Sequence, residues 1–388
     1  MTAGPAPLLN TPSARRRLRQ TLRAYTNHLI ATPRNARAAP VSPAAEVEVV
    51  LNLLHKCQAL DEGASFVRLL QHFGVLLGRS GPLDQLDQHL AAALARDDLS
   101  PDQRVQLASL SIRLLIDLGN RERAQAVLAA TWPVAEGFPH LQVELYFRQG
   151  LLAATFGDYT AGREAYEAGL TLALANRDSE RSSILYHNLG NMLYALDEYA
   201  EALAYYARAL EVGQELPDPI HRARAENGLA MTLDELGRYR EAAQHYDTAR
   251  RWAEQAGDLF ILVSVDLNLS YHAILQGRYV EVKRPASRAL ALARRLGDLH
   301  RQATASHNLG RACLGLGEYE DAWAHLSQAL EKRLLLRKPL FIQTTAAVIA
   351  ELAHVLRTDT TLAPTTRERL RQACQEALET AQSALSPG

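Results

Sequence analysis

Small and apolar residues recur along this chain with a period of 40 residues. Each period contains a step of Gly or Asp, any residue and Tyr, which begins at residues 157, 197, 237, 277 and 317. Further apolar residues follow at spacings of three and four, which places them on one helix face. The pattern predicts five pairs of helices, each pair joined at the step, where glycine permits a positive φ. Two sets of small or compact residues are expected where paired helices meet: Gly150, Gly190, Ala230, Ser270, Gly310 and Gly162, Ala202, Ala242, Val282, Ala322.

The flanking sequence predicts further helices. Two weaker pairs are expected at about 65–98 and 101–137, and two amphipathic segments at about 340–357 and 365–384. The predicted fold is all-α: a right-handed α-solenoid of about seven helix pairs with capping helices at both ends. The expected domains are a basic helix and a Pro-, Ala- and Arg-rich linker in 1–45, a helical region with two divergent repeats in 46–137, five repeats in 138–337 and capping helices in 338–388.

The repeated unit resembles the tetratricopeptide repeat (TPR) in a 40-residue variant. "HNLG" at 187–190 and 307–310 supplies the Leu-Gly positions, and Tyr166, Tyr206 and Tyr246 precede a small residue by three positions. The resemblance implies antiparallel helix pairs whose first helices line a groove for a peptide or protein segment. The tryptophan usual near the start of the first helix is replaced by Tyr146, Tyr186, Glu226, Asp266 and Ser306.

A weaker resemblance covers residues 12–100, which are similar to the segment before the TPR sensor of STAND-type bacterial regulators. An Arg-rich helix, a linker and the residues Glu48, Asn52, Leu53 and Leu54 carry this resemblance. The chain has no G-x-x-x-x-G-K-[ST] phosphate loop. The resemblance therefore implies the ligand-sensing arm of a transcriptional regulator, without its ATPase, as a separate protein or a fragment. A Rap-like inhibitor of a response regulator is a further alternative.

Composition and charge narrow the class of protein. The formal net charge is −1, so no overall field attracts nucleic acid or an anionic membrane. The preference for arginine over lysine is typical of GC-rich bacterial genomes. Three isolated cysteines indicate a reducing compartment. No apolar run of transmembrane length and no secretory apolar region are evident, so we expect a cytoplasmic protein without a membrane partner.

The N-terminal segment differs from the rest in charge. Residues 1–45 contain no Asp or Glu but seven arginines, at positions 15, 16, 17, 19, 23, 34 and 37. An apolar stripe at helical spacing runs through Leu18, Leu22, Tyr25 and Leu29. Two interpretations remain open. The helix either docks on nucleic acid, anionic lipid, an acidic partner or an ATPase partner, or it caps the first repeat with its arginines in water. We expect the segment to be dispensable for folding of the repeats; aggregation of a chain without it would favour the capping interpretation.

The sequence offers no catalytic constellation. Its histidines are scattered without metal-ligand spacing, and no nucleophile elbow occurs. Cys57 and Cys313 lie in apolar helical contexts and are expected to be packed. The acidic pairs Asp197-Glu198 and Asp234-Glu235 follow helix ends and are expected to be solvated or capping. We expect no enzyme, no cofactor and no metal.

The first helices supply the candidate binding residues. If the leucine before each small residue points into the core, the groove positions lie two and one before it and two and five after it. Asn188, Asn268 and Asn308 each directly precede the leucine, and their amides either bracket a peptide backbone or hold neighbouring helices in register. We predict a non-enzymatic scaffold that acts as a regulatory adaptor or sensor. Its partner-binding residues are predicted to be His187, Asn188, Asn191, Tyr194, Asn227, Met231, Asp234, Asn268, Tyr271, His307, Asn308 and Arg311.

Overall fold

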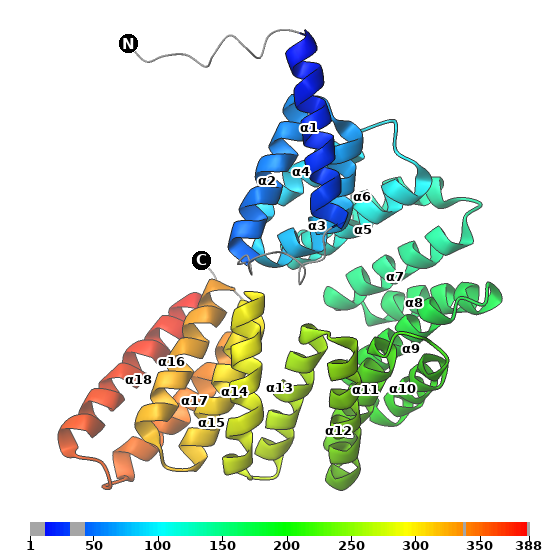
Figure 1. Cartoon of the computed structure of the whole chain (residues 1–388). Coiled ribbons are helices and arrows are strands. Elements are labelled where there is room, and N and C mark those ends of the chain that lie inside the picture. Colours follow the sequence, from blue (N-terminus) through cyan, green and yellow to red (C-terminus); the bar gives the residue numbers. More distant parts are fainter. Residues whose placement is uncertain (1–11, 32–42, 337–338, 386–388) are drawn as a thin grey trace, which may run out of the picture. The chain divides into compact units, whose positions relative to one another are not determined.

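The computed structural model describes residues 12–31, 43–336 and 339–385, and its regular elements in these ranges are all helical (Figure 1). The all-α prediction is therefore confirmed. The predicted linker at 32–42, with Arg34 and Arg37, lies outside the described residues. The chain divides into two compact units, residues 1–181 and 182–388.

Unit 1 consists of antiparallel helices around two apolar clusters. The first cluster joins the first five helices through residues such as Leu22, Leu54 and Leu70. The second lies farther along the chain and includes Ile112 and Leu145. The elements in order are α1 (Pro12–Ala31), α2 (Pro43–Ala59), α3 (Gly63–Ser80), α4 (Leu83–Leu94), α5 (Pro101–Asp117), α6 (Arg121–Thr131), the 3-10 helix η3 (Trp132–Ala135), α7 (Pro139–Thr155) and α8 (Tyr159–Ala175).

Unit 2 is a stack of helices in which each helix from α10 onward packs against the next. The first helices of successive pairs also touch, α11 against α13 and α13 against α15. This is the arrangement of an α-solenoid. The elements are α9 (Ser179–Ala195), which crosses the division between the units, α10 (Tyr199–Gln214), α11 (Ile220–Glu235), α12 (Tyr239–Ala256), α13 (Leu259–Leu275), α14 (Tyr279–Leu296), α15 (Leu299–Gly315), α16 (Tyr319–Leu335), α17 (Pro339–Thr358) and α18 (Pro364–Leu385).

The turn within each pair follows the 40-residue period. Gly157, Gly237, Gly277 and Gly317 have φ of 82, 70, 67 and 76°, and Asp197 takes their place with φ 61°. The residue after each of these closes the helix end by a backbone hydrogen bond to the carbonyl oxygen five residues earlier, as in Arg238 N to Leu233 O over 2.8 Å. The second helix then begins at the predicted tyrosine in all five pairs.

The small residues let large side chains pack between helices. Tyr206 of α10 is fully buried, and its ring faces Gly190 of α9 and Gly228 of α11. A Cβ added at Gly228 would lie 2.4 Å from Cε1 of this ring, and one at Gly190 would lie 2.7 Å from it. The glycines therefore create the space that the tyrosine fills, as the sequence pattern predicted for facing helices.

The basic helix α1 is less separate than expected. Leu22 and Leu29 of its apolar stripe are buried in the first core cluster of unit 1, whereas Leu18 and Tyr25 are exposed. Arg23 donates to the buried carboxylate of Glu62 over 2.5 Å. The helix therefore caps the unit with one part of its stripe, and its dispensability for folding of the repeats stays a prediction.

Helix α17 corrects a further expectation. It is long and apolar enough, by length and composition, to cross a membrane, whereas no apolar run of transmembrane length was expected. Its residues Ile342, Ile349, Leu352 and Leu356 are buried in a cluster shared with α16 and α18. The helix is therefore a packed element of the stack.

Candidate functional site

The candidate binding face is formed by the first helices of four successive pairs, α9, α11, α13 and α15. In these helices Leu189, Leu229 and Leu309 are buried, which turns the predicted groove positions toward the neighbouring first helices. We call the twelve predicted side chains on these helices the first-helix face. The structure places them in three groups: amides between helices, buried polar groups, and exposed side chains.

Asn227 and Asn268 link α11 to α13. The side-chain nitrogen of Asn268 donates to the side-chain oxygen of Asn227 over 3.0 Å, and the nitrogen of Asn227 lies 3.5 Å from the sulfur of Met231. Asn188 instead bonds within α9, where its nitrogen donates to the carbonyl oxygen of Ile184 over 2.7 Å. All three amides are half-buried. The oxygens of Asn188 and Asn268 accept no hydrogen bond from the described part of the chain, so they remain available as acceptors.

Asn308 is in a different environment from the other two asparagines. It is only 4% exposed, and its nitrogen donates to Ser270 Oγ over 2.7 Å and to the carbonyl oxygen of Leu267 over 3.4 Å. These bonds connect α15 to α13. At this position the geometry favours the register-holding alternative over contact with a ligand.

His187 and His307 are packed as neutral rings. Burial, followed by the charge of nearby arginines, lowers the pKa of each imidazole to about 3; these arginines are Arg224 for His187, and Arg333 and Arg311 for His307. The ring of His187 lies 5.5 Å from that of Tyr206. Both residues keep part of their surface exposed. They can therefore offer a ligand a neutral aromatic edge but no positive charge at neutral pH.

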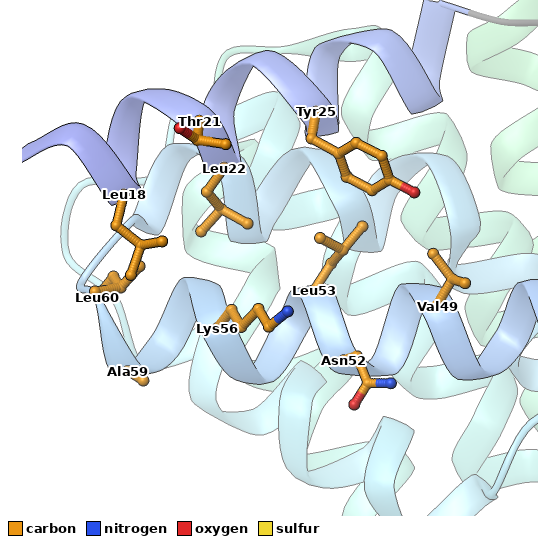
Figure 2. A pocket seen from close by; sticks show the side chains of 10 residues that line it. All are labelled: Leu18, Thr21, Leu22, Tyr25, Val49, Asn52, Leu53, Lys56, Ala59 and Leu60. Carbon is orange, nitrogen blue, oxygen red and sulfur yellow. The ribbon is translucent and has the colours of Figure 1, made fainter. Parts of the chain in front are cut away.

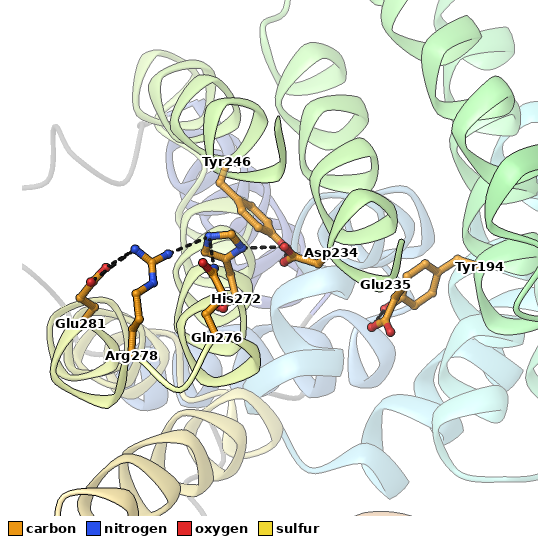
Figure 3. Close-up of polar contacts among 8 residues, drawn as sticks. All are labelled: Tyr194, Asp234, Glu235, Tyr246, His272, Gln276, Arg278 and Glu281. Carbon is orange, nitrogen blue, oxygen red and sulfur yellow. Dashed lines mark hydrogen bonds and ion pairs between the residues drawn. The ribbon is translucent and has the colours of Figure 1, made fainter. Parts of the chain in front are cut away.

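Asp234 was expected to be solvated or capping, but the structure buries it. It is 3% exposed and accepts hydrogen bonds from Tyr246 Oη over 3.0 Å and from His272 Nδ1 over 2.6 Å (Figure 3). Gln276 Nε2 lies 2.8 Å from His272 Nε2, so the amide donates to that nitrogen and Nδ1 carries the ring proton. Burial, followed by the charge of Asp234, raises the pKa of Tyr246 well above its ordinary value.

Asp234 and His272 form a pair of the kind found in catalytic dyads, but the imidazole is not accessible to a substrate. His272 is 4% exposed, and both ring nitrogens are engaged by Asp234 and Gln276. A general base needs a nitrogen within reach of a substrate proton. The arrangement instead ties α11, α12 and α13 together through charge-assisted hydrogen bonds.

The outer part of the first-helix face is formed by two exposed residues, Asn191 and Tyr271, and three half-buried ones, Tyr194, Met231 and Arg311. The hydroxyl of Tyr194 donates to Glu235 over 3.0 Å, and the oxygen of Asn191 accepts from Tyr206 over 2.7 Å. Tyr271 is 38% exposed. Arg311 is half-buried and makes no ion pair with any described residue.

Glu235 is the member of this surface that the sequence analysis missed. Its carboxylate lies close enough to Tyr194 and Tyr271 to raise the pKa of both phenols, after the larger effect of burial. The acidic pair at 234–235 was visible in the sequence, but its two members have different environments. The carboxylate of Asp234 is buried, whereas Glu235 is exposed.

The described residues contain no group of three or more His, Cys, Asp or Glu side chains placed to hold a metal ion. Cys57, Cys313 and Cys374 are buried, and burial raises the pKa of each thiol to about 11. These thiols are packed, as expected for Cys57 and Cys313, and are poorly suited to act as nucleophiles.

Comparison with known proteins agrees with this architecture. A family model for the tetratricopeptide repeat matches residues 180–255. No curated protein sequence matches the chain. A solved structure of a Rap protein complexed with Competence and Sporulation Factor is similar, with 13% identity, 88% of this chain and 99% of that chain covered, and a TM-score of 0.56. The apo form of RapI is also similar, with 13% identity, coverage of 73% and 99%, and a TM-score of 0.54.

Fold and repeat together define an all-α protein built from stacked helix pairs. The chain contains tetratricopeptide repeats, matched over residues 180–255, and has an α-solenoid fold. Tetratricopeptide repeats generally serve as non-catalytic scaffolds for protein interactions. They therefore indicate that this chain is a protein-interaction scaffold.

Proposed function

We propose that the first-helix face binds an extended peptide or protein segment, and that the chain is a non-enzymatic regulatory adaptor or sensor in a bacterial cytoplasm. The observation that carries the proposal is the hydrogen-bonding capacity that the fold leaves unused. The oxygens of Asn188 and Asn268 and the guanidinium of Arg311 have no partner among the described residues, and Tyr271 is exposed beside them.

These groups suit the chemistry of an extended backbone. Amide oxygens accept from peptide N–H groups, and an arginine donates to carbonyl or carboxylate oxygens. Adjacent helix axes are about 8–10 Å apart and an extended chain rises about 3.3 Å per residue, so four first helices span roughly eight residues. Met231 and Tyr271 then offer apolar contacts to the side chains of such a segment.

The similarity to a Rap protein complexed with Competence and Sporulation Factor supports a bound factor in a chain of this fold. The sensor arm of a STAND-type regulator and a Rap-like inhibitor remain alternatives for the cellular role. A nucleic-acid or ATPase partner of the basic N-terminus remains a prediction that no observation here favours.

The test uses peptides selected by the protein itself. A display library of random peptides of about 12 residues is selected against the full chain, and the best binder is measured by calorimetry against variants. Asn188→Ala combined with Asn268→Ala removes two hydrogen bonds of about 0.5–1.5 kcal/mol each, so affinity is expected to fall about 5- to 150-fold. Arg311→Ala and Tyr271→Ala are expected to weaken binding as well.

Arg208→Ala is the matched control for Arg311→Ala. Arg208 lies on α10, the second helix of its pair, and its side chain is 65% exposed. This variant is expected to leave affinity unchanged. Binding that survives all the first-helix variants, or that Arg208→Ala weakens equally, would refute the proposed face. Thermal melts of each variant separate lost affinity from lost fold.

A further inference from the structure

Unit 1 contains an apolar groove between α1 and α2 that is separate from the first-helix face. Figure 2 shows Leu18 and Tyr25 of α1 above Leu53 and Val49 of α2, with Leu60 at one end. The groove has a volume of about 730 Å³. That is within the range of about 300–1,000 Å³ that is usual for binding clefts.

The fold does not use the apolar side chains at the edge of this groove. Leu22 is 6% exposed and closes the floor, but Leu18 is 39% exposed, Tyr25 47% and Val49 36%. Their exposure is unfavourable, because removing large apolar side chains from water stabilises a protein or a complex. Clustered exposed apolar side chains mark interaction sites more often than scattered ones do.

The dimensions of the groove fit one helix. The wall formed by α2 and the residue that follows it is lined at positions 49, 53, 56 and 60, which are spaced four, three and four residues apart. At about 1.5 Å per residue this wall is roughly 16 Å long, or about three helical turns. A helix of about 11 or 12 residues with apolar anchors at i, i+4 and i+7 would cover it.

Charged side chains at the rim of the groove define which residues suit the polar side of an occupying helix. Lys56 lines the groove and Arg16 is exposed near the start of α1; neither forms an ion pair with any described residue. Arg19 and Arg23 are both directed to the buried Glu62.

Acidic side chains near the groove are fewer than basic ones. Glu48 is exposed next to Val49, at the opposite end from Leu60. Asp61 follows Leu60, and its charge helps to raise the pKa of Arg96. The end of the groove near Lys56 therefore favours carboxylates in an occupant.

We propose that the groove between α1 and α2 is the docking site for an amphipathic helix of a partner protein. The helix presents apolar residues at i, i+4 and i+7 to the groove and carries acidic residues on the side facing Lys56. The site is independent of the first-helix face, so either can exist without the other.

The experiment uses the full chain and a designed 14-residue helical peptide. The peptide has leucines at i, i+4 and i+7 and glutamates beside them, and a second peptide has lysines in place of the glutamates. Fluorescence anisotropy is expected to show binding of the acidic peptide and at least about tenfold weaker binding of the basic one. Leu18→Ser and Tyr25→Ser are each expected to weaken the acidic peptide about tenfold, since each removes a buried apolar contact.

Two variants sharpen the test. Lys56→Glu is expected to reverse the preference between the two peptides. Leu335→Ser is the matched control for Leu18→Ser, because Leu335 is 68% exposed on α16, and it is expected to leave binding unchanged.

Three results would overturn the proposal. The first is equal binding of the acidic peptide to the wild-type chain and to Leu18→Ser and Tyr25→Ser. The second is binding to phosphatidylserine vesicles, but not to the peptide, that these variants abolish, which would make the occupant a lipid surface. The third is self-association in sedimentation, again lost in Leu18→Ser and without peptide binding, which would make the occupant a second copy of the chain.

Discussion

Replacing Asn308 by alanine is the sharpest test of what the recurring asparagine does. Its amide is buried, donates to Ser270 Oγ over 2.7 Å, and lies 3.4 Å from the carbonyl oxygen of Leu267. The change removes one good hydrogen bond, about 0.5–1.5 kcal/mol, and leaves a small cavity that adds to the cost. Alanine regains about 0.5 kcal/mol through its helix propensity.

The expected net loss is about 1–2 kcal/mol in the free energy of unfolding. For a unit of about 200 residues this lowers Tm by roughly 2–8 °C. Asn188→Ala is the matched control, because the amide of Asn188 bonds only to the Ile184 carbonyl in its own helix. Because the Asn188 side chain is half-buried, the higher helix propensity of alanine offsets the loss of this hydrogen bond. The free energy of unfolding of Asn188→Ala is expected to differ from that of the wild-type chain by less than about 0.5 kcal/mol.

Urea unfolding and calorimetric melts of both variants decide the matter. A double-mutant cycle with Ser270→Ala adds the pair energy, expected to be about 0.5–1.5 kcal/mol. If Asn308→Ala is as stable as Asn188→Ala, or the cycle shows no coupling to Ser270, the assignment of a register-holding role to Asn308 is refuted.

Two further predictions concern the packing of unit 2. Gly228→Ala brings a Cβ within 2.4 Å of the Tyr206 ring, so overpacking of about 1–3 kcal/mol is expected to exceed the propensity gain and lower Tm; an additional Tyr206→Leu should reduce the loss, and no Tm change in Gly228→Ala would contradict the contact. His187 and His307 have pKa values lowered to about 3 in the fold, whereas the unfolded chain takes up these protons below about pH 6.5. Stability is therefore expected to fall on acidification from pH 6.5 toward 3, by at most about 1.4 kcal/mol per pH unit for each ring. The double variant His187→Gln, His307→Gln should flatten this dependence in denaturant titrations at each pH, and an unaltered slope would show that the rings are protonated in the fold.

Much of the fold could be predicted because its determinants are local. The turn glycines, the tyrosine at the start of each second helix and the small residues act within one pair of helices, and each repeats after 40 residues. Asp258 and Asp298 follow the same logic, because each accepts a hydrogen bond from the backbone three residues later and caps its helix. Such signals can be identified in sequence without knowing what a helix packs against.

The polar site was harder to predict because its contacts cross between pairs. Asp234 is buried by Tyr246 and His272, which are 12 and 38 residues away. No periodic pattern distinguishes it from Glu235, its exposed neighbour. The stripe on α1 was likewise visible in sequence, but which of its members are buried depends on α2 and α3.

The position directly before the leucine shows why a repeated motif does not imply a repeated function. Asn308 bonds to Ser270, 38 residues earlier, and Asn268 bonds to Asn227, 41 residues earlier. For Asn188 the residues 38 and 41 earlier in sequence are Gly150 and Phe147, which offer no polar side-chain atom.

The hydrogen-bond partner of each asparagine thus depends on the residues of the preceding repeat. Asn308 donates to a serine, Asn268 donates to a second amide, and Asn188 has neither partner and bonds within its own helix. The amides that are free to serve a ligand are those whose preceding repeat leaves them incompletely satisfied. If the first-helix face binds a partner as proposed, its specificity therefore resides in the differences between repeats, and the shared "HNLG" reflects the packing that the repeats have in common.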